Sequence, residues 1–242
     1  MALSTAREVK SVHTWVSDGT CGLNGREFCE AVQVKANAVP TRCRMARGRP
    51  EKDRMCRAGC NEKETLGHVS QRCYKTNGAM IRRHDAVASV LAKELVRIGY
   101  NVSVEPVIST YHGKLKPDLV AVREGKCYVI DPTVTGRDNI DLAHRWKVRK
   151  YESNPDVRKY LVDKHGEIPI KFGSLTMSYR GIMSKESVEL LTAIGVTKAA
   201  LKRAVVVCLR ETARLVRMFI YSCMRGPSHF KQKTRGHGIR VD

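Results

Sequence analysis

Acidic and aromatic side chains are both scarce in this sequence of 242 residues. Phe, Trp and Tyr make up only 6% of the chain, and 24 Asp and Glu stand against 44 Lys and Arg, so the formal net charge is +20. A chain this basic is typical of proteins that bind a polyanion, and nucleic acid is the leading candidate. The hydrophobic fraction of 42% still allows a buried core, so we expect one ordinary domain and a smaller module.

Long apolar runs are absent as well. The longest, Ala204 to Leu209, is far too short to span a bilayer, so we expect no membrane anchor. The first residues lack a charged start followed by a sustained apolar stretch, and a secretory signal is therefore not expected. These absences favour a protein of the cell interior.

The nine cysteines do not suggest a disulfide framework, because their number is odd and they are spread along the chain. Three of them cluster with a histidine in the pattern Cys56-x3-Cys60-x7-His68-x4-Cys73. Three thiolates and one imidazole complete the tetrahedral coordination of zinc and leave no position for a substrate, so the pattern predicts a structural zinc knuckle. A segment this short would fold only with the metal bound. The alternative is that the four residues lie close together by chance.

Two aspartates lie at the ends of strand-like runs, Asp118 in residues 117–122 and Asp131 in residues 127–132. If Glu124-Gly125 forms a two-residue hairpin turn, paired residues have numbers that sum to 249, and Asp118 faces Asp131. Directly opposed side chains are about 5 Å apart, so the two carboxylates repel each other. A bound divalent cation such as Mg²⁺ or Mn²⁺ would offset the repulsion, and phosphodiester cleavage requires such an ion. The pair predicts a metal-dependent nuclease centre, and the alternative is two carboxylates that merely end strands in solvent.

A nuclease centre also needs a cation beside the metal, to orient water and to stabilise the charge that grows on the phosphate. The position two residues after the second carboxylate holds Thr133, so the candidates lie on the following helix. Lys147 and Lys150 are three residues apart, which places them on one helical face. Lys147 is our first choice, and either residue could instead be an ordinary surface lysine.

Candidates for contact with nucleic acid occur in two places. The segment 41–50 carries Arg42, Arg44, Arg47 and Arg49, whose planar side chains match phosphate oxygens, although a solvated basic linker is an equal alternative. Arg83 and His84 open an expected helix, where they would contact DNA or the active site. The alternative for His84 is a polar surface residue.

The spacing of apolar and turn-forming residues predicts the order helix, three strands, helix, strand. The expected helices cover residues 27–38, 81–98, 138–165 with a break near Asn154-Pro155, 187–194 and 198–223. The expected strands cover residues 101–108, 117–122, 126–134 and 168–177. The expected parts of the chain are a basic N-terminal linker region (1–50), the zinc knuckle (51–80), a nuclease core (81–180) and a C-terminal helical extension (181–242).

Taken together, these residues resemble the C-terminal region of site-specific non-LTR retrotransposon proteins that carry a restriction-like endonuclease. The resemblance covers nearly the whole chain. It rests on Pro40-Thr41-Arg42, the Cys-Cys-His-Cys knuckle, Arg83-His84-Asp85, Lys116-Pro117-Asp118, Asp131 and the helix that ends with Lys150-Tyr151.

The resemblance implies an α/β fold with the PD-(D/E)xK restriction-endonuclease-like core, α-β-β-β-α-β, between the zinc knuckle and the C-terminal helices. It implies an endonuclease that nicks a double-stranded DNA target, commonly in ribosomal RNA genes, so that the new 3′ hydroxyl primes reverse transcription. The partners implied are the target DNA, the element RNA and an upstream reverse transcriptase in the same longer protein, with the nucleus, or the nucleolus for ribosomal targets, as the location.

The lysine position departs from the general nuclease pattern and agrees with the retroelement branch. No reverse transcriptase is expected within these 242 residues. The alternative function is a zinc-containing DNA- or RNA-binding module with an inactive nuclease-like core.

Overall fold

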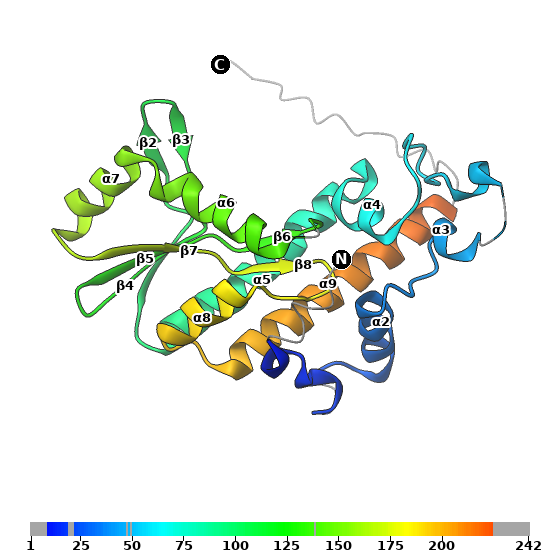
Figure 1. Cartoon of the computed structure of the whole chain (residues 1–242), viewed down its shortest axis with the longest axis horizontal. Coiled ribbons are helices and arrows are strands. Elements are labelled where there is room, and N and C mark those ends of the chain that lie inside the picture. The colour runs from blue at the N-terminus through cyan, green and yellow to red at the C-terminus, as the bar shows by residue number, and fades with distance from the viewer. Residues whose placement is uncertain (1–8, 19–21, 47, 49, 138, 225–242) are drawn as a thin grey trace, which may run out of the picture.

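A long helix, α9 (Lys198–Met224), runs through the middle of the molecule, and the other elements pack around it (Figure 1). The computed structural model describes residues 9–18, 22–46, 48, 50–137 and 139–224. Residues 204–209 of α9 are all buried, so this part of the helix is enclosed on every side, as a helix that is apolar all round must be. The expected C-terminal extension is therefore, over its described residues, a central packing element.

Two helices lie along α9. One is α5 (Asn77–Arg97), whose buried positions Val87, Leu91 and Leu95 recur every four residues and form one face. The other is α2 (Gly25–Lys35), which begins with a capping box between Asn24 and Glu27. The described part of the expected N-terminal linker region is thus folded.

The N-terminal half also contains short elements, of which the first two and the last two contact α9. They are η1 (Lys10–Val12), η2 (Thr14–Val16), α3 (Arg42–Met45), η3 (Glu51–Arg54), α4 (Leu66–Gln71) and η4 (Tyr74–Thr76). Val12 and Trp15 are fully buried and belong to the same apolar core as α5 and α9. Leu66 and Val69 of α4 also belong to it, so the knuckle shares this core.

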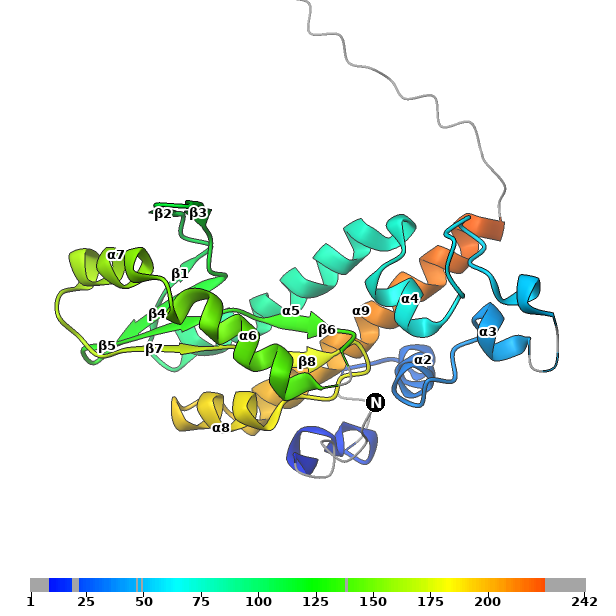
Figure 2. The same cartoon turned by 45° about the horizontal axis from the view of Figure 1, so that its top comes forward.

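A mixed four-stranded sheet lies at the opposite end of the molecule from α3 (Figures 1 and 2). Its strand order is β1 (Asn101–Val104), β4 (Leu119–Arg123), β5 (Lys126–Ile130) and β7 (Ile170–Gly173). The first three strands are antiparallel, and β7 is parallel to β5. A parallel neighbour needs a crossover connection, which here contains α6 (Ile140–Glu152) and α7 (Pro155–His165).

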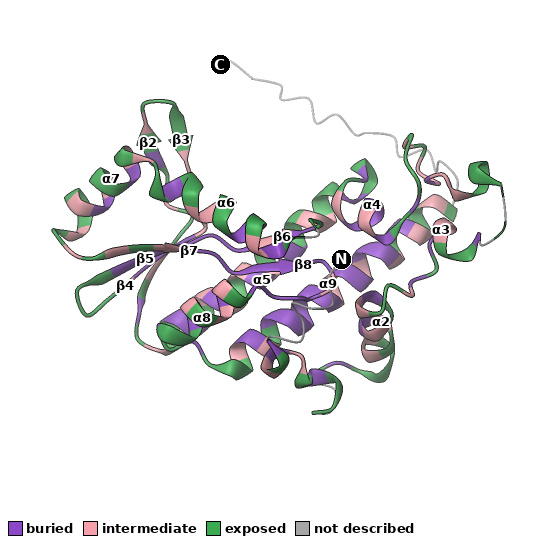
Figure 3. Cartoon of the chain, in the orientation of Figure 1, coloured by how far each residue is buried: buried purple, intermediate pink, exposed green. Residues whose placement is uncertain are grey.

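The sheet is covered on both faces, and side chains alternate between two cores. Leu119, Ala121 and Ile130 belong to the main core with α5 and α9. Val120 and Val129 belong to a second, smaller core with residues of α6 and α7. This alternation is the period of two that a strand imposes on its side chains, and it explains why β4 and β5 are buried throughout their middle residues (Figure 3).

The turn between β4 and β5 confirms the predicted register. Both turn residues have positive φ, +50° at Glu124 and +65° at Gly125, as a two-residue hairpin turn requires. The pairs run from Arg123 with Lys126 to Leu119 with Ile130, so every pair sums to 249. Asp118 and Asp131 are the next positions after the last pair.

Two predicted strands, 126–134 and 168–177, are each broken in the middle. Pro132 has no N–H to donate to a neighbouring strand. The carbonyl of Asp131 accepts a hydrogen bond from the Ser174 hydroxyl at 2.6 Å in place of one from a backbone N–H. Beyond the break, the two segments pair with each other as the short parallel strands β6 (Thr133–Thr135) and β8 (Thr176–Ser178). The break leaves Asp131 at the end of β5.

The remaining differences are small. The strand predicted for 101–108 ends early, and a hairpin of β2 (Ile108–Thr110) and β3 (Gly113–Leu115) follows that was not predicted. The break near Asn154-Pro155 is confirmed, because the Asn154 side chain caps α7. Helix α8 (Lys185–Ala193) matches the predicted 187–194, and α5 begins four residues before the predicted 81.

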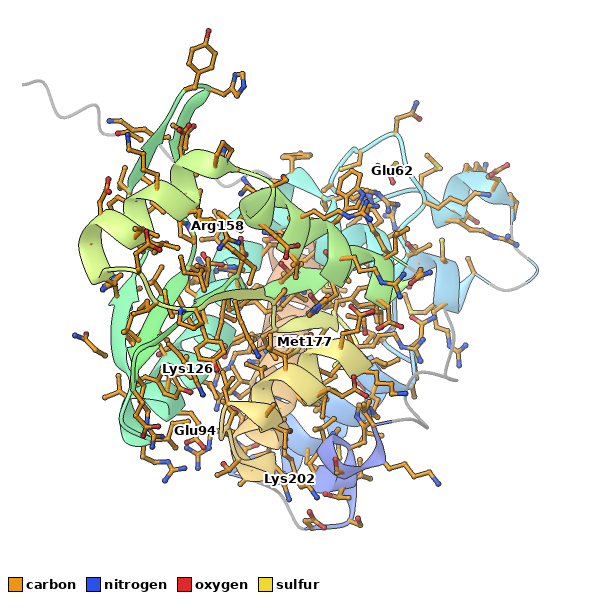
Figure 4. All side chains as sticks on the ribbon, turned by 60° about the vertical axis from the view of Figure 1, so that its left-hand side comes forward. Glu62, Glu94, Lys126, Arg158, Met177 and Lys202 are labelled. Carbon is orange, nitrogen blue, oxygen red and sulfur yellow. The ribbon has the colours of Figure 1, made fainter. Side chains whose placement is uncertain are left out.

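The side chains of the described residues leave the middle of the molecule well filled (Figure 4). Met177 of β8 lies there and is fully buried, whereas Lys126 at the hairpin and Lys202 of α9 lie nearer the edge. Within the described residues, no helix combines the length and the apolar character that crossing a membrane requires.

Candidate functional site

Asp118 and Asp131 lie together at the edge of the sheet, where β4 begins and β5 ends. The Asp118 side chain is 16% exposed and the Asp131 side chain only 3%. Backbone hydrogen bonds hold both residues, because the Asp118 carbonyl accepts from Glu105 N at 2.8 Å and Asp131 N donates to the Gly173 carbonyl at 3.2 Å. The carboxylates are thus fixed by the sheet and not by flexible loops.

His84 of α5 completes this cluster. Its Nε2 lies 3.2 Å from Asp118 Oδ2 and 3.0 Å from the Pro132 carbonyl oxygen, and its Nδ1 lies 3.2 Å from Asp85 Oδ1. One ligand atom each from His84, Asp118 and Asp131 falls within 4.8 Å of the others, which is close enough to hold one metal ion.

Lys147 of α6 reaches the same cluster from the other face of the sheet. Its Nζ donates to Asp131 Oδ1 at 3.0 Å. Lys150 turns away toward Tyr151, where its Nζ lies 3.2 Å from the hydroxyl and 4.8 Å from the ring centroid. Of the two candidate lysines, only Lys147 contacts a carboxylate of the pair.

The charges of the cluster balance one another. Burial pushes the pKa of Asp118 up, but the hydrogen bond from His84 and the positive charges around it outweigh burial and hold that pKa below its ordinary value. Asp131 is more deeply buried and faces a second carboxylate, so its pKa is raised, although Lys147 opposes the rise. The hydrogen bond to Asp118 raises the pKa of His84 to about 9. Two cationic side chains therefore offset the carboxylates.

Tyr151 is a further member of the site that the sequence analysis did not select. It is 2% exposed, its hydroxyl donates to the Lys116 carbonyl at 3.2 Å, and burial together with the nearby Asp131 raises its pKa. Tyr151 follows Lys147 by four residues and so lies on the same face of α6, a spacing that identifies it once Lys147 is chosen.

The prediction that Arg83 contacts nucleic acid is wrong for this structure. Its side chain is 2% exposed and donates to the Ser70 carbonyl at 3.0 Å and to Thr212 Oγ1 at 3.1 Å. Arg83 precedes Val87 by four residues, so it lies on the apolar face of α5 and points into the core. Its hydrogen bonds link α5 to α4 and α9, and its buried charge is not accessible to DNA.

The other arginines predicted to contact nucleic acid differ in their surroundings. The Arg42 side chain is half-buried and donates to the Met55 carbonyl at 3.1 Å, which fastens α3 to the knuckle. Arg44 is exposed on the same short helix. Arg47 and Arg49 lie outside the described residues.

The four predicted zinc ligands gather into one cluster that could bind zinc. Ligand atoms of Cys56, Cys60, His68 and Cys73 all lie within 4.8 Å of one another. The Sγ of Cys73 is 3.7 Å from that of Cys60 and 4.0 Å from that of Cys56. Tetrahedral zinc, with Zn–S bonds of about 2.3 Å, places two sulfurs about 3.8 Å apart, so these separations fit the ion.

The histidine of this cluster also fits a metal. His68 is 1% exposed, and its Nε2 has no hydrogen-bond partner, which is unusual for a buried ring nitrogen. Its Nδ1 lies 3.2 Å from Glu62 Oε2, and a carboxylate in that place commonly orients a metal-bound histidine. Burial raises the pKa of Cys73 to about 12, so a cation is needed to hold this sulfur as a thiolate.

No family model matches the chain. Curated relatives do match it. The Pol polyprotein of the type-2 retrotransposable element R2DM of Drosophila melanogaster is 40% identical over 187 residues, which cover 76% of this chain. The corresponding R2 polyproteins of Bradysia coprophila and Nasonia vitripennis are 34% and 31% identical and cover 86% and 83% of it. The chain belongs to the R2 non-LTR retrotransposon Pol family.

The match covers only part of these R2 relatives. The aligned region is 17% of the Drosophila protein, 24% of the Bradysia protein and 20% of the Nasonia protein, so this chain spans about a fifth of their length. The expected resemblance to non-LTR retrotransposon proteins is confirmed, and the homologues are longer Pol polyproteins.

The raised pKa of His84 predicts a measurable titration in the metal-free protein. We expect the His84 ring to titrate near pH 9 by NMR, and to titrate closer to its ordinary 6.5 in Asp118→Asn. Because the folded pKa lies above the unfolded value, the stabilisation is complete below pH 6.5 and is lost as the pH rises through 9. Mg²⁺ should lower the His84 pKa, since it competes for the same carboxylate. A His84 pKa near 6.5 in the wild type would contradict the contact.

The cysteine cluster predicts that Cys60→Ser loses bound zinc. Metal analysis of purified protein should show one zinc per chain in the wild type and a large loss in the variant. Hydrogen exchange should quicken around residues 50–80, while exchange in β4 and β5 is unchanged. Cys43→Ser is the matched control, because Cys43 lies nearby, donates to the Arg54 carbonyl at 3.5 Å and is not a member of the ligand cluster. Unchanged zinc in Cys60→Ser would remove the assignment.

Proposed function

We propose that this chain is a metal-dependent DNA endonuclease that nicks the target of an R2-type retrotransposon. The observation that carries the proposal is the pair Asp118 and Asp131, brought together at a sheet edge with Lys147 in contact. Two carboxylates and a lysine at such an edge are the groups that metal-assisted phosphodiester hydrolysis uses. The basic charge of the chain supports a nucleic-acid substrate.

The fold supports a PD-(D/E)xK core. The order α5, β1, β4, β5, α6, β7 follows the helix, three strands, helix and strand of that core, with β2–β3, β6 and α7 as additions. The carboxylates lie at the start of β4 and the end of β5, which are neighbours in the sheet. Lys147 comes from α6, in agreement with the displaced lysine of the retroelement branch.

The donor atoms fit a hard divalent cation. Asp118, Asp131 and the Pro132 carbonyl supply oxygen ligands, which Mg²⁺ and Mn²⁺ prefer, and Asp118 and the Pro132 carbonyl both contact His84 Nε2. When bound, such an ion supplies an activated water and neutralises charge on the phosphate.

The side chains of the site have separate roles in this proposal. Lys147 places a positive charge 3.0 Å from Asp131 Oδ1, where it donates a hydrogen bond to the phosphate or to the attacking water. His84 holds a proton at Nε2 against Asp118 and balances part of the negative charge of the carboxylate pair. Tyr151 is buried, interacts with Asp131 and helps to keep bulk water from this carboxylate.

The knuckle has a structural role in this proposal. Zinc at Cys56, Cys60, His68 and Cys73 would stabilise the α4 region. Arg44, exposed on the neighbouring α3, would contact the DNA backbone.

The relatives are named Pol polyproteins, so the 3′ hydroxyl made by nicking would prime reverse transcription by a polymerase elsewhere in a longer protein, with the element RNA as template. This activity implies a nuclear location, and a nucleolar one if ribosomal DNA is the target.

The proposal predicts that the wild type relaxes supercoiled plasmid in Mg²⁺ and that Asp118→Ala and Asp131→Ala do not. Removal of a side chain that hydrogen-bonds to a metal ligand reduces metal affinity or activity by roughly 10- to 100-fold. Removal of a ligand itself should therefore reduce the rate of nicking by more than about 100-fold. Lys147→Ala should reduce the rate by roughly 10²- to 10⁴-fold, and Lys150→Ala, the matched control on the same helix, by much less.

Two results would reject the proposal. One is nicking that survives both aspartate substitutions. The other is DNA binding by the wild type without nicking in Mg²⁺ or Mn²⁺, which would instead support a zinc-containing binding module with an inactive core.

A further inference from the structure

The β2–β3 hairpin stands away from the sheet (Figures 1 and 2), and the chain that leaves it leads directly to Asp118. Its loop residues are Tyr111 and His112, and β3 ends at Leu115, three residues before Asp118. Seven residues of extended chain span at most about 25 Å, so the hairpin tip lies within that distance of Asp118. Base pairs of DNA are about 3.4 Å apart, and the tip therefore reaches within roughly seven base pairs of a phosphate held at Asp118.

The hairpin is held firmly. Ile108 is fully buried in the second core together with Val157 and Leu161 of α7. At the tip, Tyr111 N donates to Asp156 Oδ2 at 2.8 Å, and Thr110 Oγ1 donates to the Gly113 carbonyl at 2.8 Å. The backbone that carries the loop is thus fixed against α7 before any partner binds.

The loop presents an aromatic ring to solvent. Tyr111 is 91% exposed, the highest value among the large apolar side chains of the described residues. Its ring and that of His112 lie edge to face with their centroids 5.0 Å apart, and its hydroxyl has no hydrogen bond within the described residues. Tyrosine is enriched at binding interfaces because it joins an apolar ring to a polar hydroxyl, so an exposed tyrosine on a fixed backbone is suited to contact a partner. Exposed Lys114 and Lys116 follow on the path to Asp118, and Lys116 forms an ion pair with Glu105.

We infer that Tyr111 stacks on an unstacked base of the target DNA, within roughly seven base pairs of the bond that the carboxylate centre cuts. The inference rests on the proposed nuclease function. Every base, whatever the DNA sequence, offers a flat face to an aromatic ring, and exposed Lys114 beside the loop suits a neighbouring phosphate. Neighbouring pairs cover the base faces in a duplex, so the ring reaches one only where a step is opened, as protein wedges do. The chain should therefore prefer DNA with an opened step.

The experiment compares two duplexes of one sequence, one fully paired and one with a central two-nucleotide mismatch that carries 2-aminopurine. The full chain is titrated in Ca²⁺ in place of Mg²⁺, so that DNA is bound without being cut. We expect tighter binding to the mismatched duplex and quenching of 2-aminopurine by the stacked ring. Tyr111→Ala should weaken binding to the mismatched duplex by on the order of tenfold, change binding to the paired duplex little, and abolish the quenching.

Two further variants control the result. Tyr111→Phe keeps the ring and should behave as the wild type. Tyr221→Ala removes another tyrosine, 55% exposed near the C-terminal end of α9, and should leave both affinities unchanged. This end of α9 lies at the other side of the molecule from the hairpin (Figure 1).

Two outcomes would overturn the inference. If Tyr111→Ala binds the mismatched duplex as tightly as the wild type, the hairpin does not contact bases, and a protein partner would be the better assignment. If Tyr111→Ala weakens both duplexes equally, the contact is to the backbone and not to a base face.

A separate variant tests the proposed nuclease function. Asp131→Ala should lose nicking and keep the mismatch preference. If the wild type never nicks DNA but prefers the mismatched duplex, and Tyr111→Ala lacks that preference, only the nuclease proposal is rejected.

Discussion

Two like charges forced together at one end of a hairpin are the constraint on which the rest of this structure depends. At about 5 Å and an effective dielectric constant of 20, two carboxylates repel by about 3 kcal/mol, a large part of the 5–15 kcal/mol that stabilises an ordinary domain. The turn at Glu124-Gly125 and the ladder from Arg123 to Leu119 leave Asp118 and Asp131 no other register. Compensating positive charge is therefore required, and His84 and Lys147 supply it from the two faces of the sheet.

The need to place His84 and Lys147 beside the carboxylates explains why the rest of the chain is arranged around the helices that carry them, α5 and α6. Arg83, next to His84, is buried between the Ser70 carbonyl of α4 and Thr212 of α9, so the knuckle and the long helix both fix the position of α5. Tyr151 fixes α6 through its contact with the Lys116 carbonyl. The cysteine cluster and the carboxylate pair thus belong to one packed structure, although they lie about sixty residues apart in sequence.

Local chemistry made much of this predictable from the sequence, and long-range packing limited the rest. The Asp118 and Asp131 register followed from a turn of two residues and the period of a strand, and the cysteine cluster followed from ligand spacing. Arg83 was misassigned because its charge was read without its place on the apolar face of α5. The central position of α9 escaped prediction because burial of residues 204–209 depends on partners from distant parts of the chain.

The central claim is that Asp118 and Asp131 share one divalent cation. Crystals of this chain grown or soaked with Mn²⁺, and measured at the manganese absorption edge, test it directly. The account predicts one anomalous peak between the two carboxylates, about 2.2 Å from an oxygen of each, with His84 Nε2 no longer against Asp118. No peak there, with His84 and Lys147 still paired to the carboxylates, would contradict it.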